Sequence, residues 1–148
     1  MPKNLSDATA LFLYRNVIVP WETKLKNETG CWDVKRSRDA LKPADIHLEC
    51  VEIGEVEKTA KELLISRDKN FIVFVSANSQ MKDLFRHIRN CAAHASISSH
   101  TSGTNGSTLR FSANLRRRPE LAVSGQITSA CLNLVMAALV TAPKARSE

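Results

Sequence analysis

Residues 81–94 read MKDLFRHIRNCAAH, and the spacing of their apolar side chains predicts an amphipathic helix that begins after Asn78 or Ser79 and extends to about Ser96. The apolar stripe consists of Met81, Leu84, Phe85, Ile88, Cys91 and Ala92. The polar side chains that interrupt it are Arg86, His87, Arg89, Asn90 and His94. Either these polar residues converge on a site, or they face water as ordinary surface residues.

Further helices are predicted on both sides of this segment. Ser6 is a suitable N-cap for a first helix, which we expect to break or kink at Pro20 and to continue over residues 21–28. Apolar residues at helical spacing predict a second helix over residues 43–64, with Pro43 in its first turn. A final helix is expected over about residues 128–141. The chain is therefore predicted to be mainly helical.

Strand signals are short and occur mostly in the second half of the chain. Periodicity does not decide whether the run FIVFV at residues 71–75 is a strand or a buried helix. Residues 109–113 and 121–124 predict a small hairpin, and Arg116, Arg117 and Arg118 fall in its turn. We expect an all-α fold, a helical bundle with this hairpin before the C-terminal helix.

Composition limits the class of protein. The 148 residues fit one domain, residues 1–148, and 43% hydrophobic with 24% charged residues is typical of a globular protein. The net charge of +6, from 21 basic and 15 acidic residues, favours polyanionic partners such as nucleic acid. Ordinary charge scatter on a solvated surface is the alternative interpretation.

The cysteine pattern and the N-terminus favour the cytoplasm. The four cysteines are widely separated and form no Cys-x-x-Cys pair, so we expect reduced, buried thiols with no zinc site. The N-terminus lacks the layout of a signal peptide, and no apolar run reaches the length of about 18 residues that spans a membrane. We expect no cofactor, no metal and no membrane contact.

The polar residues of the 81–94 helix have the chemistry of metal-free RNA cleavage. Asn90 and His94 are four residues apart and share a face, whereas Arg89 lies about 140° around the axis from His94. Histidine can transfer a proton to or from ribose oxygens, and the arginine fork can hold phosphate oxygens. A long side chain or a second copy of the helix must close the gap between Arg89 and His94.

Two other chemistries are less consistent with the sequence. A metal site could be built from His87, His94 and His100, with His47 as an optional further ligand, but no His-Glu-x-x-His motif occurs and the separations do not match a local zinc pattern. A Cys91–His94 dyad is disfavoured because Cys91 lies toward the negative end of its helix.

The segment 84–94 resembles the signature of the HEPN superfamily, an arginine and a polar residue followed by a histidine, here Arg89, Asn90, three residues and His94. The resemblance implies a helical bundle that dimerises through its motif helices, and a metal-independent ribonuclease of toxin–antitoxin or defence systems. It implies that Arg89 contacts the scissile phosphate, that His94 transfers protons and that Asn90 supports them. A tyrosine shortly after the histidine, found in some members, is absent, because Ala95 and Ser96 follow.

We extend this site by extrapolation to five substrate-binding residues, Arg86, His87, Arg116, Arg117 and Arg118. The predicted protein is thus a cytoplasmic, homodimeric endoribonuclease acting on RNA, with an antitoxin protein as an additional expected partner. The alternative is a noncatalytic module of the same kind that binds nucleic acid, a nucleotide or a protein.

Overall fold

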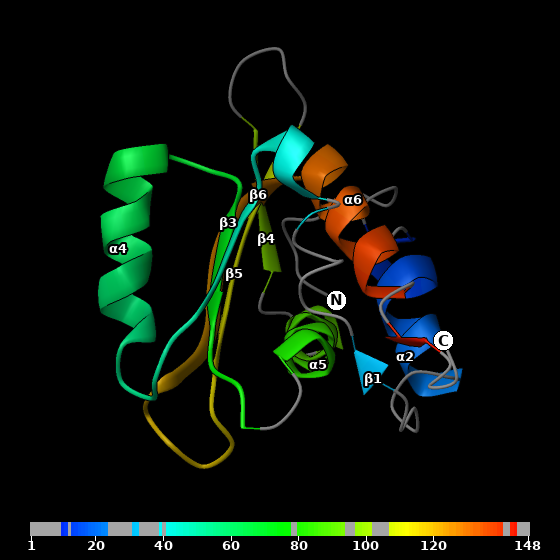
Figure 1. The fold of residues 1–148 in the computed structure, drawn as a ribbon, viewed down its shortest axis with the longest axis horizontal. Helices are drawn as coiled ribbons and strands as arrows, with labels where there is room; N and C mark the ends of the chain where they lie inside the picture. Colours follow the sequence, from blue (N-terminus) through cyan, green and yellow to red (C-terminus); the bar gives the residue numbers. More distant parts are fainter. Residues whose placement is uncertain are drawn as a thin grey trace.

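A mixed five-stranded sheet lies at the centre of the fold (Figure 1), so the predicted all-α bundle is wrong. The strand order is β2-β3-β6-β5-β4, in which β2 and β3 are parallel and all other neighbours are antiparallel. The computed structural model describes residues 10–11, 13–23, 31–32, 39, 41–77, 80–93, 97–101, 107–140 and 143–144. Within these residues the protein has an α/β fold.

The strands of the large sheet are β2 (His47–Cys50), β3 (Phe71–Phe74), β4 (Ile97–Thr101), β5 (Ser107–Asn114) and β6 (Leu121–Thr128). A separate antiparallel pair joins β1 (Cys31–Trp32) and β7 (Pro143–Lys144). The helical segments are η1 (Tyr14–Ile18), α2 (Val19–Thr23), η3 (Lys42–Ala44), α4 (Val56–Arg67), α5 (Gln80–Ala93) and α6 (Ser129–Val140). Figure 1 shows α4 on one face of the sheet, with α5, α6 and α2 on the other.

The helix expected over residues 43–64 is the main error behind the wrong fold class. Pro43 begins only a single 3₁₀ turn, and Asp45 then leaves helical geometry with a φ of 55°. Residues 47–50 pair in parallel with β3, and Gly54, with a φ of 93°, lies in the turn before α4. Backbone pairing with a strand more than twenty residues away thus prevails over the local helical spacing.

Strand β3 resolves the ambiguous run at residues 71–75. All four of its residues are buried, because α4 covers one face of the sheet and α5 the other (Figure 1). Ile72 and Phe74 belong to the larger core cluster with α5, whereas Phe71 and Val73 pack with α4 in the smaller cluster. A strand buried on both faces has no polar alternation, which explains the continuous apolar run.

Strands β5 and β6 form the expected hairpin, but they are eight residues long and central to the sheet. Leu109 pairs with Ile127 and Phe111 with Gly125 on the α5 face. Arg110 and Ser112, which alternate with them, are exposed on the opposite face. The hairpin therefore forms one side of the main core and is not a peripheral addition to a helical bundle.

The first and last helices agree partly with the predicted positions. The chain stays helical through Pro20, but the segment before it is a π-helix in which the Val19 N–H bonds to the Tyr14 carbonyl. The helix type thus changes where a kink was expected. The continuation to residue 28 and the Ser6 cap lie partly or wholly outside the described residues. Helix α6 matches the final predicted helix.

Candidate functional site

Helix α5 is the amphipathic helix that the sequence predicts. Leu84, Phe85, Ile88 and Cys91 are fully buried, and Ala92 is 3% exposed. Burial raises the pKa of the Cys91 thiol to about 12, so the thiolate that a Cys91–His94 dyad needs does not form at neutral pH. Cys91 is therefore a packing residue.

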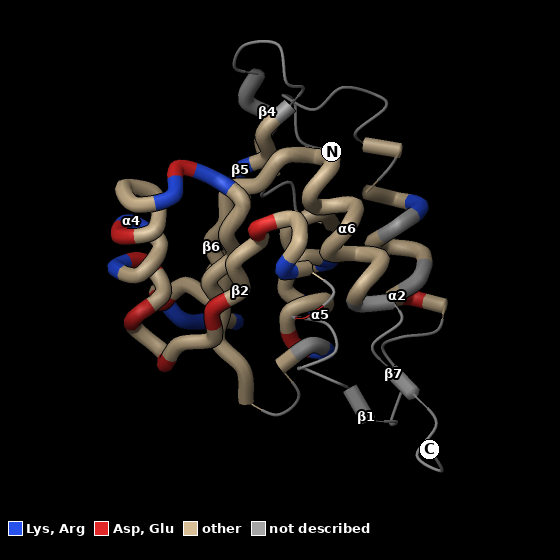
Figure 2. Tube along the Cα trace, turned by 45° about the horizontal axis from the view of Figure 1, so that its top comes forward, with Lys and Arg blue, Asp and Glu red and all other residues tan. Residues whose placement is uncertain are grey.

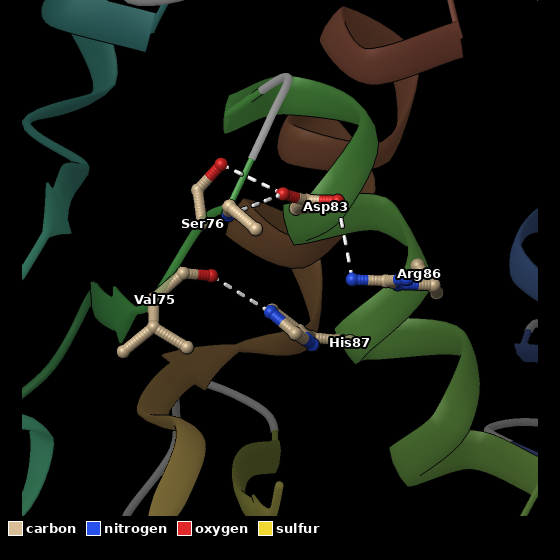
Figure 3. A network of polar contacts seen from close by, with 6 residues as sticks. Val75, Ser76, Asp83, Arg86 and His87 are labelled. Carbon is tan, nitrogen blue, oxygen red and sulfur yellow. Dashed lines mark hydrogen bonds and ion pairs between the residues drawn. The ribbon is translucent and has the colours of Figure 1, made fainter. Parts of the chain in front are cut away.

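Asp83 fixes the start of α5 against the end of β3 (Figure 3). Its carboxylate is almost fully buried, and it accepts hydrogen bonds from the Ser76 hydroxyl at 2.7 Å and from the Ala77 N–H at 3.0 Å. Arg86 donates to the other carboxylate oxygen at 3.2 Å. These bonds attach the loop after β3 to the first turns of α5 and so determine where the helix lies.

His87 faces the sheet rather than the solvent. Its side chain is buried, and its Nε2 donates a hydrogen bond to the Val75 carbonyl at 2.8 Å (Figure 3). Burial lowers the pKa of His87 from 6.5, and the charge of Arg86 lowers it further, whereas the Val75 bond and Asp83 act in the opposite direction. A neutral imidazole held in this way joins α5 to β3.

Arg86 is the more accessible member of this network. Half of its side chain is exposed, although it forms an ion pair with the buried Asp83. Because an arginine has five N–H donors, a guanidinium that makes this one contact can still bind a phosphate from solvent. Arg86 is therefore placed to contact a polyanion at the surface of α5.

Arg89 and Asn90 lie together near the end of the described helix. The Arg89 Nη1 donates to Asn90 Oδ1 at 3.0 Å, and its Nη2 forms a short ion pair with the Glu22 carboxylate from α2. About a quarter of the Arg89 side chain is exposed, and its Nε is buried with no hydrogen-bond partner among the described residues. The guanidinium is thus held in one orientation by two acceptors.

His94, the third residue of the predicted catalytic set, lies outside the described residues. The described part of α5 ends at Ala93, so Arg89 and Asn90 are brought together while the position of His94 relative to them is not described. Of the three predicted catalytic residues, two are placed in direct contact.

Arg116, Arg117 and Arg118 lie in a different region, the turn between β5 and β6. All three are exposed, Arg117 has a φ of 61°, and Arg118 pairs with Glu120 at 3.2 Å. The flanking Leu115 and Leu121 pack in the smaller core cluster with α4, which covers the sheet face opposite α5. Among the described residues, no hydrogen bond or ion pair joins this turn to Arg89.

Glu22 is the residue of this site that sequence reasoning missed. It contacts Arg89, which is 67 positions away in the chain, and no local sequence pattern predicts a contact between residues so far apart. Asp83 was missed for a related reason, because an acidic residue in the first turn of a helix is common and two of its partners, Ser76 and Ala77, lie in the loop after β3.

The fold and the site together describe an α/β protein with an open mixed sheet, whose helix α5 carries a paired arginine and asparagine at its end. Comparison with protein-family models, curated proteins and solved structures found no significant match. In the described residues, no helix is long and apolar enough to cross a membrane, and no three metal-ligating side chains gather at one point.

Proposed function

We propose that this protein is a metal-independent endoribonuclease that acts through Arg89, Asn90 and His94. The observation that carries the proposal is the contact between Arg89 and Asn90, which orients a partly exposed arginine side chain five residues before His94 in the sequence. The net charge of +6 and the exposed Arg86 support an RNA substrate, because both attract phosphates. The chemistry depends on these side chains and does not require a helical bundle.

In the proposed reaction the ribose 2′-oxygen attacks the adjacent phosphorus and the 5′-oxygen leaves, giving a 2′,3′-cyclic phosphate and a 5′-hydroxyl. Neutral His94 accepts the 2′-hydroxyl proton, and the imidazolium returns a proton to the leaving oxygen. Arg89 stabilises the additional negative charge on the phosphate oxygens. Asn90 acts on the orientation of Arg89 through its Oδ1.

The ion pair with Glu22 favours a second candidate function, a module that binds RNA without cleaving it. Glu22 already neutralises Arg89, and a phosphate must share or displace this carboxylate to reach the guanidinium. An arginine held by a carboxylate can also serve mainly to attach α2 to α5. The two candidates differ in turnover, which an experiment can measure.

The test is cleavage of a labelled single-stranded RNA by the purified protein in the presence of EDTA. We expect Arg89→Ala and His94→Ala each to lower the cleavage rate by about a hundredfold, because each removes either charge stabilisation or proton transfer. Arg89→Lys is expected to recover little, since a lysine does not form the same two-pronged contact. Lys58→Ala, an exposed substitution on α4, serves as the matched loss of one positive charge.

Equal cleavage by the wild type, Arg89→Ala and His94→Ala would refute the proposal. Salt-sensitive RNA binding without turnover in the wild type would instead establish the noncatalytic function. The Glu22→Gln variant distinguishes a phosphate-binding role of Arg89 from a purely structural role. If Arg89 binds phosphate, Glu22→Gln tightens RNA binding, whereas a purely structural pair would only lose thermal stability.

The proposal includes the expectations about cellular context that accompany this activity. They are a cytoplasmic location, a homodimer that brings two α5 helices together, and an antitoxin protein that restrains the enzyme. Sedimentation of the purified protein tests the homodimer directly. Co-purification from cells that express neighbouring proteins tests for the antitoxin partner.

A further inference from the structure

A cavity of about 200 Å³ lies between α4 and the sheet, on the face opposite α5. Ala60 and Leu64 from α4 and Phe71 from β3 form its apolar wall. Ligand pockets for drug-sized molecules occupy about 300–1,000 Å³, so this cavity suits a smaller body such as a single ring. The proposed RNA site on α5 involves none of these residues.

Arg110 is held at the edge of this cavity by a chain of hydrogen bonds. Its Nε donates to Gln126 Oε1 at 2.8 Å, and Gln126 Nε2 donates to the Asp68 carbonyl at 2.8 Å. Arg110 and Gln126 face each other across β5 and β6, so the strand register also fixes them. Among the described residues, the two terminal nitrogens of Arg110 make no hydrogen bond or ion pair.

Lys61 adds a second positive charge to the same cavity. Its ammonium group has no ion-pair partner in the described part of the chain. Glu57, one helical turn earlier, contributes one carboxylate, so the lining carries two positive charges and one negative charge. Figure 2 shows residues of both charge signs along α4. The cavity therefore combines an apolar wall, an oriented guanidinium and a net positive charge.

We propose that this cavity binds a small organic anion, with its carboxylate or phosphate group on Arg110 and Lys61 and its apolar body against Ala60, Leu64 and Phe71. The guanidinium fork of Arg110 matches the two oxygens of either anionic group, and Gln126 fixes its direction before the ligand arrives. An apolar body gains by leaving water, so both parts of the ligand contribute.

Amide NMR titrations of the ¹⁵N-labelled protein test the proposal with benzoate and phenyl phosphate as probes. We expect saturable shifts at Ser124, Gly125 and Gln126 with both anions. Benzyl alcohol, which has the ring without the charge, is expected to bind about tenfold more weakly, because it loses the charge-assisted bonds. Inorganic phosphate, which has the charge without the ring, is also expected to bind more weakly. The ratio of the two ring anions identifies the preferred group.

Two charge substitutions that are expected to change the affinity for benzoate in opposite directions complete the test. Arg110→Gln should weaken benzoate binding about tenfold, and Glu57→Gln should tighten it about twofold by removing a repelling carboxylate. Lys58→Gln, which removes a charge from α4 outside the cavity, should leave the affinity unchanged. A gain of binding in Glu57→Gln cannot arise from misfolding.

Three results would overturn the proposal. These are the absence of saturable shifts at the cavity residues, unchanged affinity in Arg110→Gln, and equal affinity for benzoate and benzyl alcohol. None of them bears on RNA cleavage through Arg89, so the two proposals fail independently.

Discussion

At the scale of single residues, neighbouring polar side chains of α5 differ in burial, and they therefore differ in what they can bind. Arg86 is half exposed, Arg89 is held between two acceptors, and His87 is enclosed between the helix and β3. All three were expected to contact RNA from their place on one helix. The structure leaves Arg86 accessible and Arg89 partly so, and it gives His87 a bond to the sheet.

The buried His87 predicts that the protein loses stability in mild acid. Because its pKa in the folded state is lowered from 6.5, the unfolded chain binds more protons between the two values, and the free energy of unfolding rises with pH there. This contribution is complete above about pH 6.5 and is lost as the pH falls toward the folded pKa. Urea unfolding of the wild type and of His87→Gln between pH 5 and pH 8, a range of about three units around that value, measures the effect.

We expect the acid loss to be smaller in His87→Gln, which keeps an N–H donor for the Val75 carbonyl but has no titrating ring. The same pH dependence in both proteins would show that His87 makes no such contribution.

At the scale of elements, helix α5 is fixed at its start by Asp83 and along its length by an apolar stripe. The stripe was predictable because it repeats every three to four residues within one segment. The hairpin of β5 and β6 was predictable for a similar reason, since its strands are neighbours in the chain and alternate in polarity. Strand β2 was not, because its partner β3 lies beyond α4.

The Asp83 network predicts a measurable loss of stability. Asp83→Ala leaves the Ser76 hydroxyl and the Ala77 N–H without their buried acceptor, which should lower the free energy of unfolding by about 2 kcal/mol. Ser76→Ala removes only one of these bonds and should cost about 1 kcal/mol. Equilibrium denaturation of both variants gives the comparison. An equal loss in the two would assign the effect to Ser76 alone.

At the scale of the whole molecule, the sheet separates two candidate binding regions. Arg89 and Asn90 lie on α5, which covers one face, and the cavity beside Arg110 lies under α4 on the other. The sheet is open, since β2 and β4 are its edges.

A complementation experiment tests the proposed dimer. If Arg89 of one subunit acts with His94 of the other, mixing the Arg89→Ala and His94→Ala proteins creates mixed dimers with one complete site each. Random exchange should then restore about a quarter of the wild-type cleavage rate, because half of the dimers are mixed and each has one of two sites. A site contained in one chain would restore no activity in the mixture.

The sequence by itself determined the segments whose order depends on near neighbours. These are the buried face of α5, the hairpin, the final helix and the adjacent pair Arg89 and Asn90. Only the tertiary structure decided the fold class, the burial of His87 and the partner of Arg89. Each of these depends on contacts between distant parts of the chain, namely β2 with β3, α5 with β3, and Glu22 with Arg89. Local periodicity does not predict such contacts, because they form only when the sheet assembles.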